Sequence, residues 1–169
     1  MFPLFLRSES FAASVFGMVI SCTAIGGMVA GIIFPKFFKR KYALHLTSFS
    51  LFGFSLTILI PGVLAINGFS FQVYFLCLLW GLNGFFYTVT TLVFGTTVQI
   101  ESPIESIGTI TSSISSMQMA LLVSGPIMGA MLSELTSISF VFILSGLIGL
   151  VFSVYSAVLT FQHRINGVS

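Results

Sequence analysis

The sequence predicts an all-α, polytopic membrane helix bundle with five transmembrane helices, and three observations support this fold class. First, 56% of the 169 residues are hydrophobic and only 6% are charged, which is too little polar surface to cover a water-soluble globule. Second, the apolar residues form five runs, each near the roughly 20 residues that a helix needs to cross about 30 Å of hydrocarbon. Third, the runs are apolar all round and rich in Gly, whereas strands of a membrane barrel alternate over about ten residues.

The first two predicted spans are separated by a basic loop. The first span covers about 11–34 and ends at Pro35, which is followed by a cluster of basic residues that cannot enter hydrocarbon cheaply. The second covers about 43–66 and ends near Asn67 and the glycine after it. Together with the three spans below, these form a single transmembrane domain over residues 1–169.

The three remaining spans are divided by polar turns. The third covers about 70–98, and the segment Gln99-Ile-Glu101-Ser-Pro103 marks the turn after it. The fourth covers about 105–132, and Glu134 with the Thr-Ser pair that follows separates it from the fifth, at about 138–161. The fifth span ends before His163 and Arg164. With these bounds, all four Glu residues are expected in loops.

The distribution of Lys and Arg predicts the orientation. Of the six basic residues, four lie in the loop after the first span, Arg164 lies in the C-terminal tail, and Arg7 alone lies on the other side of a five-span protein. Because cytoplasmic loops carry the excess of Lys and Arg, we expect a multi-pass protein of the cell membrane with a cytoplasmic C-terminus. The N-terminus is then outside, and since residues 1–6 are too short to export it, we expect further chain upstream.

The composition also argues against several classes of function. The sequence contains no Asp, and Cys22 and Cys77 lie inside apolar runs, where they are interpreted as small hydrophobic residues rather than as a disulfide or a metal pair. The net charge of +2 is too small for a nucleic-acid partner. We therefore expect membrane lipid as a partner, no enzyme activity, and no cofactor or metal.

The basic loop carries the first sequence motif. Within the first span, Gly27 and Gly31 form a small-xxx-small pair that favours close helix packing, with Gly26 beside them. From Gly31 to Arg40 the sequence resembles the Gly-x-x-x-Asp-Arg-x-Gly-Arg-Arg loop of the major facilitator superfamily. Gly31, Lys36, Lys39 and Arg40 match, whereas Pro35 replaces the Asp and Phe38 the second Gly. The alternative is a cytoplasmic anchor that only obeys the positive-inside rule.

Two further motifs resemble the same superfamily. Gln99, Pro103, Glu105 and Gly108 match the Gln-x-x-x-Pro-x-Glu-x-x-Gly-Arg loop of its drug and macrolide exporters, with Thr109 in place of the Arg. Alternatively, Pro103 starts a helix and Glu105 complements the dipole of its first turn. The segment Gly125-Pro126-Ile-Met-Gly129 resembles the Gly-Pro-x-x-Gly-Gly motif of antiporters and predicts a kinked hinge, for which a purely structural kink is the alternative.

The three motifs give one consistent register. In it, the chain resembles helices eight to twelve of a twelve-helix facilitator, closest to macrolide-efflux-type multidrug exporters, and residues 1–6 are the remnant of helix seven. The resemblance implies a fragment of a proton-coupled exporter of apolar small molecules, inactive without its missing N-terminal half. The alternative is a non-transporting membrane protein that binds or regulates other helices through its Gly-rich faces.

Polar and aromatic residues inside the spans are the candidates for substrate contact. Trp80, Asn83 and Tyr87 are spaced by three and four residues and so share a face of the third span, and Gln118 lies in the fourth. For Asn83 and Gln118, interhelical hydrogen bonds are the alternative, since an amide in hydrocarbon needs a partner. No ionisable residue is expected at membrane depth, so proton coupling is assigned to the missing half.

Overall fold

The computed structural model describes residues 13–37, 43–67 and 72–165, and this part of the chain is helical without any strand. Each of its five helices is long and apolar enough to cross a membrane. The helices are α2 (Ala13–Phe37), α3 (Ala43–Ile66), α4 (Val73–Glu101), α5 (Ile107–Leu135) and α6 (Ile138–Ile165). The prediction of an all-α polytopic membrane protein with five spans is confirmed.

The helix ends differ from the predicted ones mainly on the C-terminal side. Pro35 does not end the first span, because α2 continues through it to Phe37. A proline this close to a helix end disturbs only the final turn, and the chain can keep its helical path. Glu101 and Glu134 likewise lie in the last turns of α4 and α5 rather than in loops. Carboxylates are tolerated there because helix ends reach the water-rich headgroup region.

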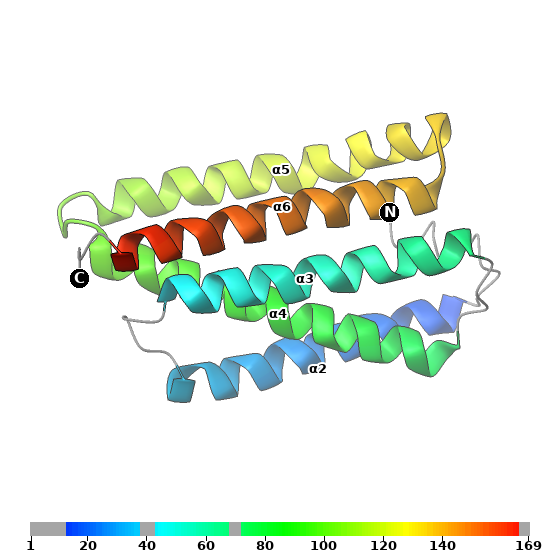
Figure 1. The fold of residues 1–169 in the computed structure, drawn as a ribbon, viewed down its shortest axis with the longest axis horizontal. Helices are drawn as coiled ribbons and strands as arrows, with labels where there is room; N and C mark the ends of the chain where they lie inside the picture. The colour runs from blue at the N-terminus through cyan, green and yellow to red at the C-terminus, as the bar shows by residue number, and fades with distance from the viewer. Residues whose placement is uncertain (1–12, 38–42, 68–71, 166–169) are drawn as a thin grey trace.

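The helices form an open row in the order α2, α4, α3, α6, α5 (Figure 1). The most extensive contacts join α3 to α6 and α2 to α4, followed by those between α3 and α4. In contrast, α5 touches α6 and α4 only slightly. The first four helices of the row therefore constitute the packed part of the molecule, and α5 lies at its open edge.

Small residues allow α2 and α4 to approach closely. A side chain at Gly26 would collide with the carbonyl of Gly81, and one at Gly84 would collide with the carbonyl of Thr23. Because contacts advance along both helices in the same direction, from Cys22 beside Gly81 to Gly27 beside Thr88, the two helices are parallel. Their backbones approach closely because glycine carries no side chain, as is usual at membrane helix interfaces.

The α3–α6 pair is antiparallel and also depends on small residues. Gly62 lies beside Phe142, and a Cβ at Gly146 would be 2.6 Å from Leu59 Cβ. At the other end, the hydroxyls of Ser48 and Ser156 are 2.9 Å apart, and Ser153 Oγ donates to the Ser48 carbonyl at 2.9 Å. These hydroxyls have their hydrogen-bond partners inside the protein, so they need no water in the membrane.

Candidate transmembrane site

The face of α4 that carries Trp80, Asn83 and Tyr87 lies toward α3 and α6. Asn83 Nδ2 donates to Thr57 Oγ1 of α3 at 2.8 Å. About two turns further along the same interface, Thr90 Oγ1 donates to Ser50 Oγ at 2.9 Å. The interhelical hydrogen bond that was the alternative for Asn83 is therefore present, and it fixes the register of α4 against α3. A substrate contact at Asn83 stays a prediction.

The two aromatic candidates have different environments. Trp80 contacts Phe142 of α6 edge-on, with ring centroids 6.5 Å apart, and packs against the buried cluster of Val19, Leu76 and Phe142. Tyr87 contacts Phe54 of α3 at a centroid distance of 6.0 Å, yet 59% of its surface is exposed. Trp80 consequently contributes to the packed part of the protein, whereas Tyr87 has a surface free for lipid or for a bound molecule.

Gln118 is not brought together with the other three candidates. It lies on α5, which contacts α4 only slightly, and its side chain is exposed. Within the described residues its carboxamide makes no hydrogen bond to another group. Four serines of α5 differ from it, because Ser112, Ser116, Ser124 and Ser133 each donate to a carbonyl three or four residues back in their own helix. Gln118 makes no such bond and still requires a partner.

One face of α5 gathers Gln118 with small and polar residues. We define the Gln118 stripe as the residues that recur at spacings of four and three along this face: Thr111, Ser115, Gln118, Leu122, Gly125 and Gly129. Such spacing places side chains above one another on a helix. Gly125 has no atom of a neighbouring element within 4 Å of the position where a Cβ would lie, so backbone is open to close approach there.

The loop between α4 and α5 does not cap α5 as the capping alternative requires. Pro103 precedes a turn in which the amides of Ser106 and Ile107 donate to the Pro103 carbonyl at 3.1 and 3.0 Å. Helix α5 begins after this turn, at Ile107, and has no acidic residue in its first turn. Glu105 lies in the turn directly before α5 and is exposed, so its predicted place in the first turn of the helix is wrong. The loop resemblance to drug exporters is unaffected.

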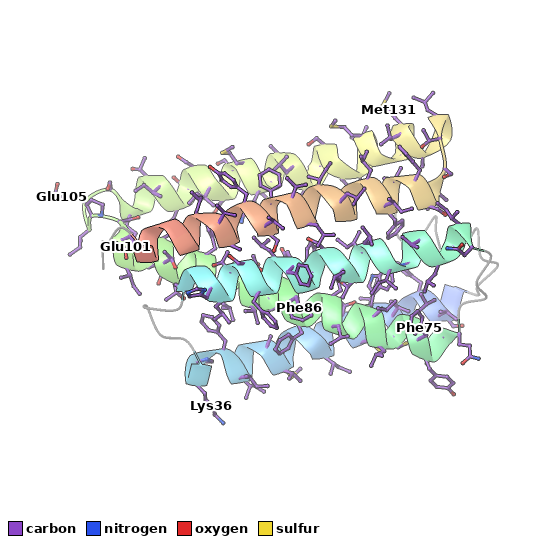
Figure 2. All side chains as sticks on the ribbon, viewed as in Figure 1. Lys36, Phe75, Phe86, Glu101, Glu105 and Met131 are labelled. Atoms are coloured by element: carbon purple, nitrogen blue, oxygen red, sulfur yellow. The ribbon has the colours of Figure 1, made fainter. Side chains whose placement is uncertain are left out.

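Three of the charged residues lie at one end of the molecule. Lys36, Glu101 and Glu105 lie at the same end, whereas Phe75 and Met131 lie toward the opposite one (Figure 2). This arrangement agrees with the predicted placement of the first and third loops on one side of the membrane. Gln99 and Gly108, which flank the third loop, are also exposed. Lys39 and Arg40 lie outside the described residues.

The small residues of the other two motifs have open surroundings. A Cβ at Gly31 would have no atom of the described neighbouring elements within 4 Å, so the predicted close packing involves Gly26 and Gly27 but not Gly31. Pro126 lies inside α5, which continues as one helix on both sides of it. The proline removes one backbone donor there. Whether this region acts as a hinge stays a prediction.

The sequence interpretation missed a contact between the two cysteines. Cys22 of α2 and Cys77 of α4 are free thiols that lie within hydrogen-bonding reach of each other. Cysteine position alone could not have revealed this pair, because it results from the parallel packing of two helices that are not consecutive in the chain. Among the described residues no group of three or more His, Cys, Asp or Glu side chains could hold a metal ion.

Comparison of the chain with protein-family models, curated proteins and solved structures found no match. The physical evidence therefore carries the assignment by itself. Five long apolar helices, with their few charges in the helix ends and loops, identify the chain as a multi-pass membrane protein.

Proposed function

We propose that the protein is part of a membrane transporter of the major facilitator type, equivalent to helices eight to twelve of a multidrug exporter. In this proposal the complete transporter lies in the cell membrane and exchanges apolar compounds, such as macrolides, for protons. The C-terminus of the chain is cytoplasmic. The three loop and helix motifs support the assignment, and the structure adds one physical observation.

That observation is the exposure of α5. It carries a run of hydroxyl and amide side chains, yet none of its residues is buried against the other helices. Polar groups inside a bilayer normally face a protein partner or a water-filled path, because hydrocarbon cannot hydrogen-bond to them. A helix that borders a translocation path meets this requirement, since such paths lie between two groups of helices near the bilayer midplane.

The positions of the charged residues support a role for this chain as one part of a larger transporter. In the described helices, Lys, Arg, His and Glu lie only within two residues of a helix end: Lys36, His45, Glu101, Glu134, His163 and Arg164. A proton-coupled exporter uses an ionisable group at membrane depth, where desolvation makes its protonation sensitive to the transport cycle. In this proposal the group belongs to the other half of the transporter, and the chain alone does not transport.

Drug accumulation in cells tests this proposal. Cells expressing the 169-residue chain alone should accumulate a fluorescent macrolide as empty-vector cells do. Cells expressing it together with a facilitator N-terminal half should accumulate less, and a protonophore should abolish the difference. The same accumulation measurements are repeated with a Gln118→Leu variant, which changes one polar side chain of the exposed helix α5. Efflux by the lone chain, or no effect in any pairing, would contradict the proposal.

The exposed α5 also favours a second candidate, a membrane protein that assembles with other helices and transports nothing. The two are distinguished by combining blue native electrophoresis with the accumulation assay. A stable complex of defined larger mass without any change in drug accumulation would favour the interaction protein. A complex whose formation lowers drug accumulation would favour the transporter.

A further inference from the structure

The two cysteines of the chain meet where small residues fix the register of α2 against α4. Cys22 lies one turn before Gly26 on α2. Cys77 likewise lies one turn before Gly81 on α4. A Cβ at Gly26 would collide with the Gly81 carbonyl, and one at Gly81 would lie 3.6 Å from the Cys22 carbonyl. Because the helices are parallel, this register carried back by one turn places Cys22 beside Cys77, within hydrogen-bonding reach.

The thiol pair lies toward one end of the helices and can be reached from outside the protein. Cys77 is the fifth residue of α4, about 6 Å along the axis from the first. Phe75, which precedes it by two residues, lies toward the end opposite to Lys36 and Glu101 (Figure 2). The side chains of both cysteines are partly exposed. An ion can therefore reach both sulfur atoms without crossing the middle of the bilayer.

The number of sulfur ligands restricts the kind of metal ion that this pair can hold. Among the described residues no third His, Cys, Asp or Glu side chain joins the two thiols in a metal-binding group. Zn²⁺ in structural sites takes four protein ligands, and Ca²⁺ and Mg²⁺ take oxygen ligands. The soft d10 ions Cu⁺, Ag⁺ and Hg²⁺, in contrast, form stable complexes with only two thiolates. The pair therefore suits a soft, two-coordinate ion.

Charge distinguishes between these three ions. Both thiols lose their protons when a metal binds, so the complex with Cu⁺ or Ag⁺ carries one negative charge, whereas the complex with Hg²⁺ is neutral. A charge inside an apolar segment is costly unless an opposite charge lies near it. Helix α4 contains no basic residue, and Lys36 of α2 lies 14 residues beyond Cys22, about 21 Å along the axis. The neutral mercury complex is therefore the favoured one.

We propose that Cys22 and Cys77 bind one Hg²⁺ ion as a neutral, two-coordinate dithiolate that joins α2 to α4. The S–H bond of each thiol breaks, each sulfur forms a bond to mercury, both protons pass to the solvent, and nothing is oxidised or reduced. With metal–sulfur bonds near the length of Zn–S, about 2.3 Å, the sulfur atoms would be at most about 4.6 Å apart. This inference does not depend on the proposed transport activity, because it concerns only the two thiols.

The test adds mercuric chloride, in equal amount, to the purified whole chain in detergent micelles, with 2-mercaptoethanol present as a competing monothiol. Native mass spectrometry counts the mercury atoms on each chain, and labelling with a maleimide counts the thiols that stay reactive. We expect one mercury atom per chain and protection of both thiols together. X-ray absorption at a mercury edge should show two sulfur neighbours and no other ligand. These measurements use the unaltered chain, so they do not depend on the folding of any variant.

Variants of the chain test whether the two thiols act together. In Cys77→Ser, mercury retention should fall about tenfold against about 0.1 mM competitor, because adjacent thiols act at an effective concentration of at least about 1 mM. The matched control is Cys77→Ser, Met119→Cys, which keeps the number of thiols but places one on α5, where Met119 is exposed. It should lose mercury as readily as Cys77→Ser does. Circular dichroism checks that both variants keep the helix content of the parent.

Several results would overturn the proposal. Two mercury atoms on one chain would mean that each thiol binds separately, and chains joined in pairs by mercury would mean that the thiols of one chain do not face each other. Retention by the Met119→Cys control equal to that of the parent would show that proximity of Cys22 to Cys77 is irrelevant. Ag⁺ held against the same competitor as firmly as Hg²⁺ would contradict the selection of the ion by charge.

Discussion

Helices α4 and α5 have the same length, 29 residues, and both carry glycine, serine or threonine among apolar residues, but they occupy different environments. Five residues of α4 are buried, whereas α5 buries none. The difference arises from their neighbours: α4 lies between α2 and α3, and α5 lies at the edge of the row. Local sequence therefore makes both segments membrane helices, and position in the row decides which one is an interface.

Glycine illustrates the difference most directly. Gly84 and Gly125 each lie in the middle part of a membrane helix, Gly84 before an aromatic residue and Gly125 before Pro126. A side chain at Gly84 would collide with the backbone of α2, while one at Gly125 would project into open surroundings. Substitutions at these two positions provide the sharpest test of the comparison.

The largest effect is expected from Gly84→Leu. Forcing a side chain into the α2–α4 contact should lower the free energy of unfolding by about 3 kcal/mol, because backbone atoms of Thr23 cannot move aside as a flexible side chain would. Gly125→Leu should change it by less than about 0.5 kcal/mol. Unfolding by sodium dodecyl sulfate in mixed micelles, followed by Trp80 fluorescence, measures both. Similar losses in the two variants would contradict the difference between α4 and α5.

The second expected effect concerns the thiol pair. Oxidation of the purified protein by O2 with copper phenanthroline should join Cys22 to Cys77 and raise the free energy of unfolding by about 2 kcal/mol, since the bond restricts the unfolded chain. Mass spectrometry of proteolytic fragments identifies the bond. A Cys77→Ser, Met119→Cys variant, with its new thiol on exposed α5, serves as the control and should not cross-link to Cys22. If oxidation of the native chain gave disulfides between molecules and none between Cys22 and Cys77 of one chain, the result would argue against the parallel α2–α4 pair.

The hydrogen bond between Asn83 and Thr57 should have a smaller effect. A double-mutant cycle with Asn83→Leu and Thr57→Val should give a coupling free energy of about 1 kcal/mol, within the range measured for polar pairs in membranes. Pairing Asn83→Leu with Thr91→Val should give a coupling near zero, because Thr91 bonds only within α4. The same micellar unfolding assay supplies all four values of each cycle. A negligible coupling for the first pair would place Asn83 elsewhere, in contact with water or substrate.

The smallest effect is expected from Gln118→Leu in the lone chain. Because Gln118 is exposed and bonds to no described residue, its replacement should change the free energy of unfolding by less than about 0.5 kcal/mol. The variant should insert into membranes at least as well as the parent, since leucine favours hydrocarbon. A loss comparable with that of Gly84→Leu would mean that α5 is packed after all, and the comparison with α4 would fail.

Most of the secondary structure could be predicted because membrane spans are specified by composition and length. The second span, 43–66, agrees with α3 at both ends. The errors lie where a proline or a charged residue was taken as a break, as at Pro35, Glu101 and Glu134, since the headgroup region allows a helix to continue past them. The shared face of Trp80, Asn83 and Tyr87 was likewise predictable, because helical spacing alone defines it.

The partners of these residues were not predictable in the same way. Cys22 meets Cys77 because α2 packs against α4 rather than against α3, its neighbour in the chain. Asn83 meets Thr57 because α4 also packs against α3 in one particular register. In a membrane the hydrophobic effect holds every apolar helix in the bilayer, but it does not select which helices pair. The sequence by itself thus determined that this is an all-helical membrane protein with charges at the helix ends. Only the tertiary structure decided which glycines lie in contact with another helix and which, like the amide of Gln118, are exposed. The reason is that close packing and hydrogen bonding depend on surfaces that meet across the fold.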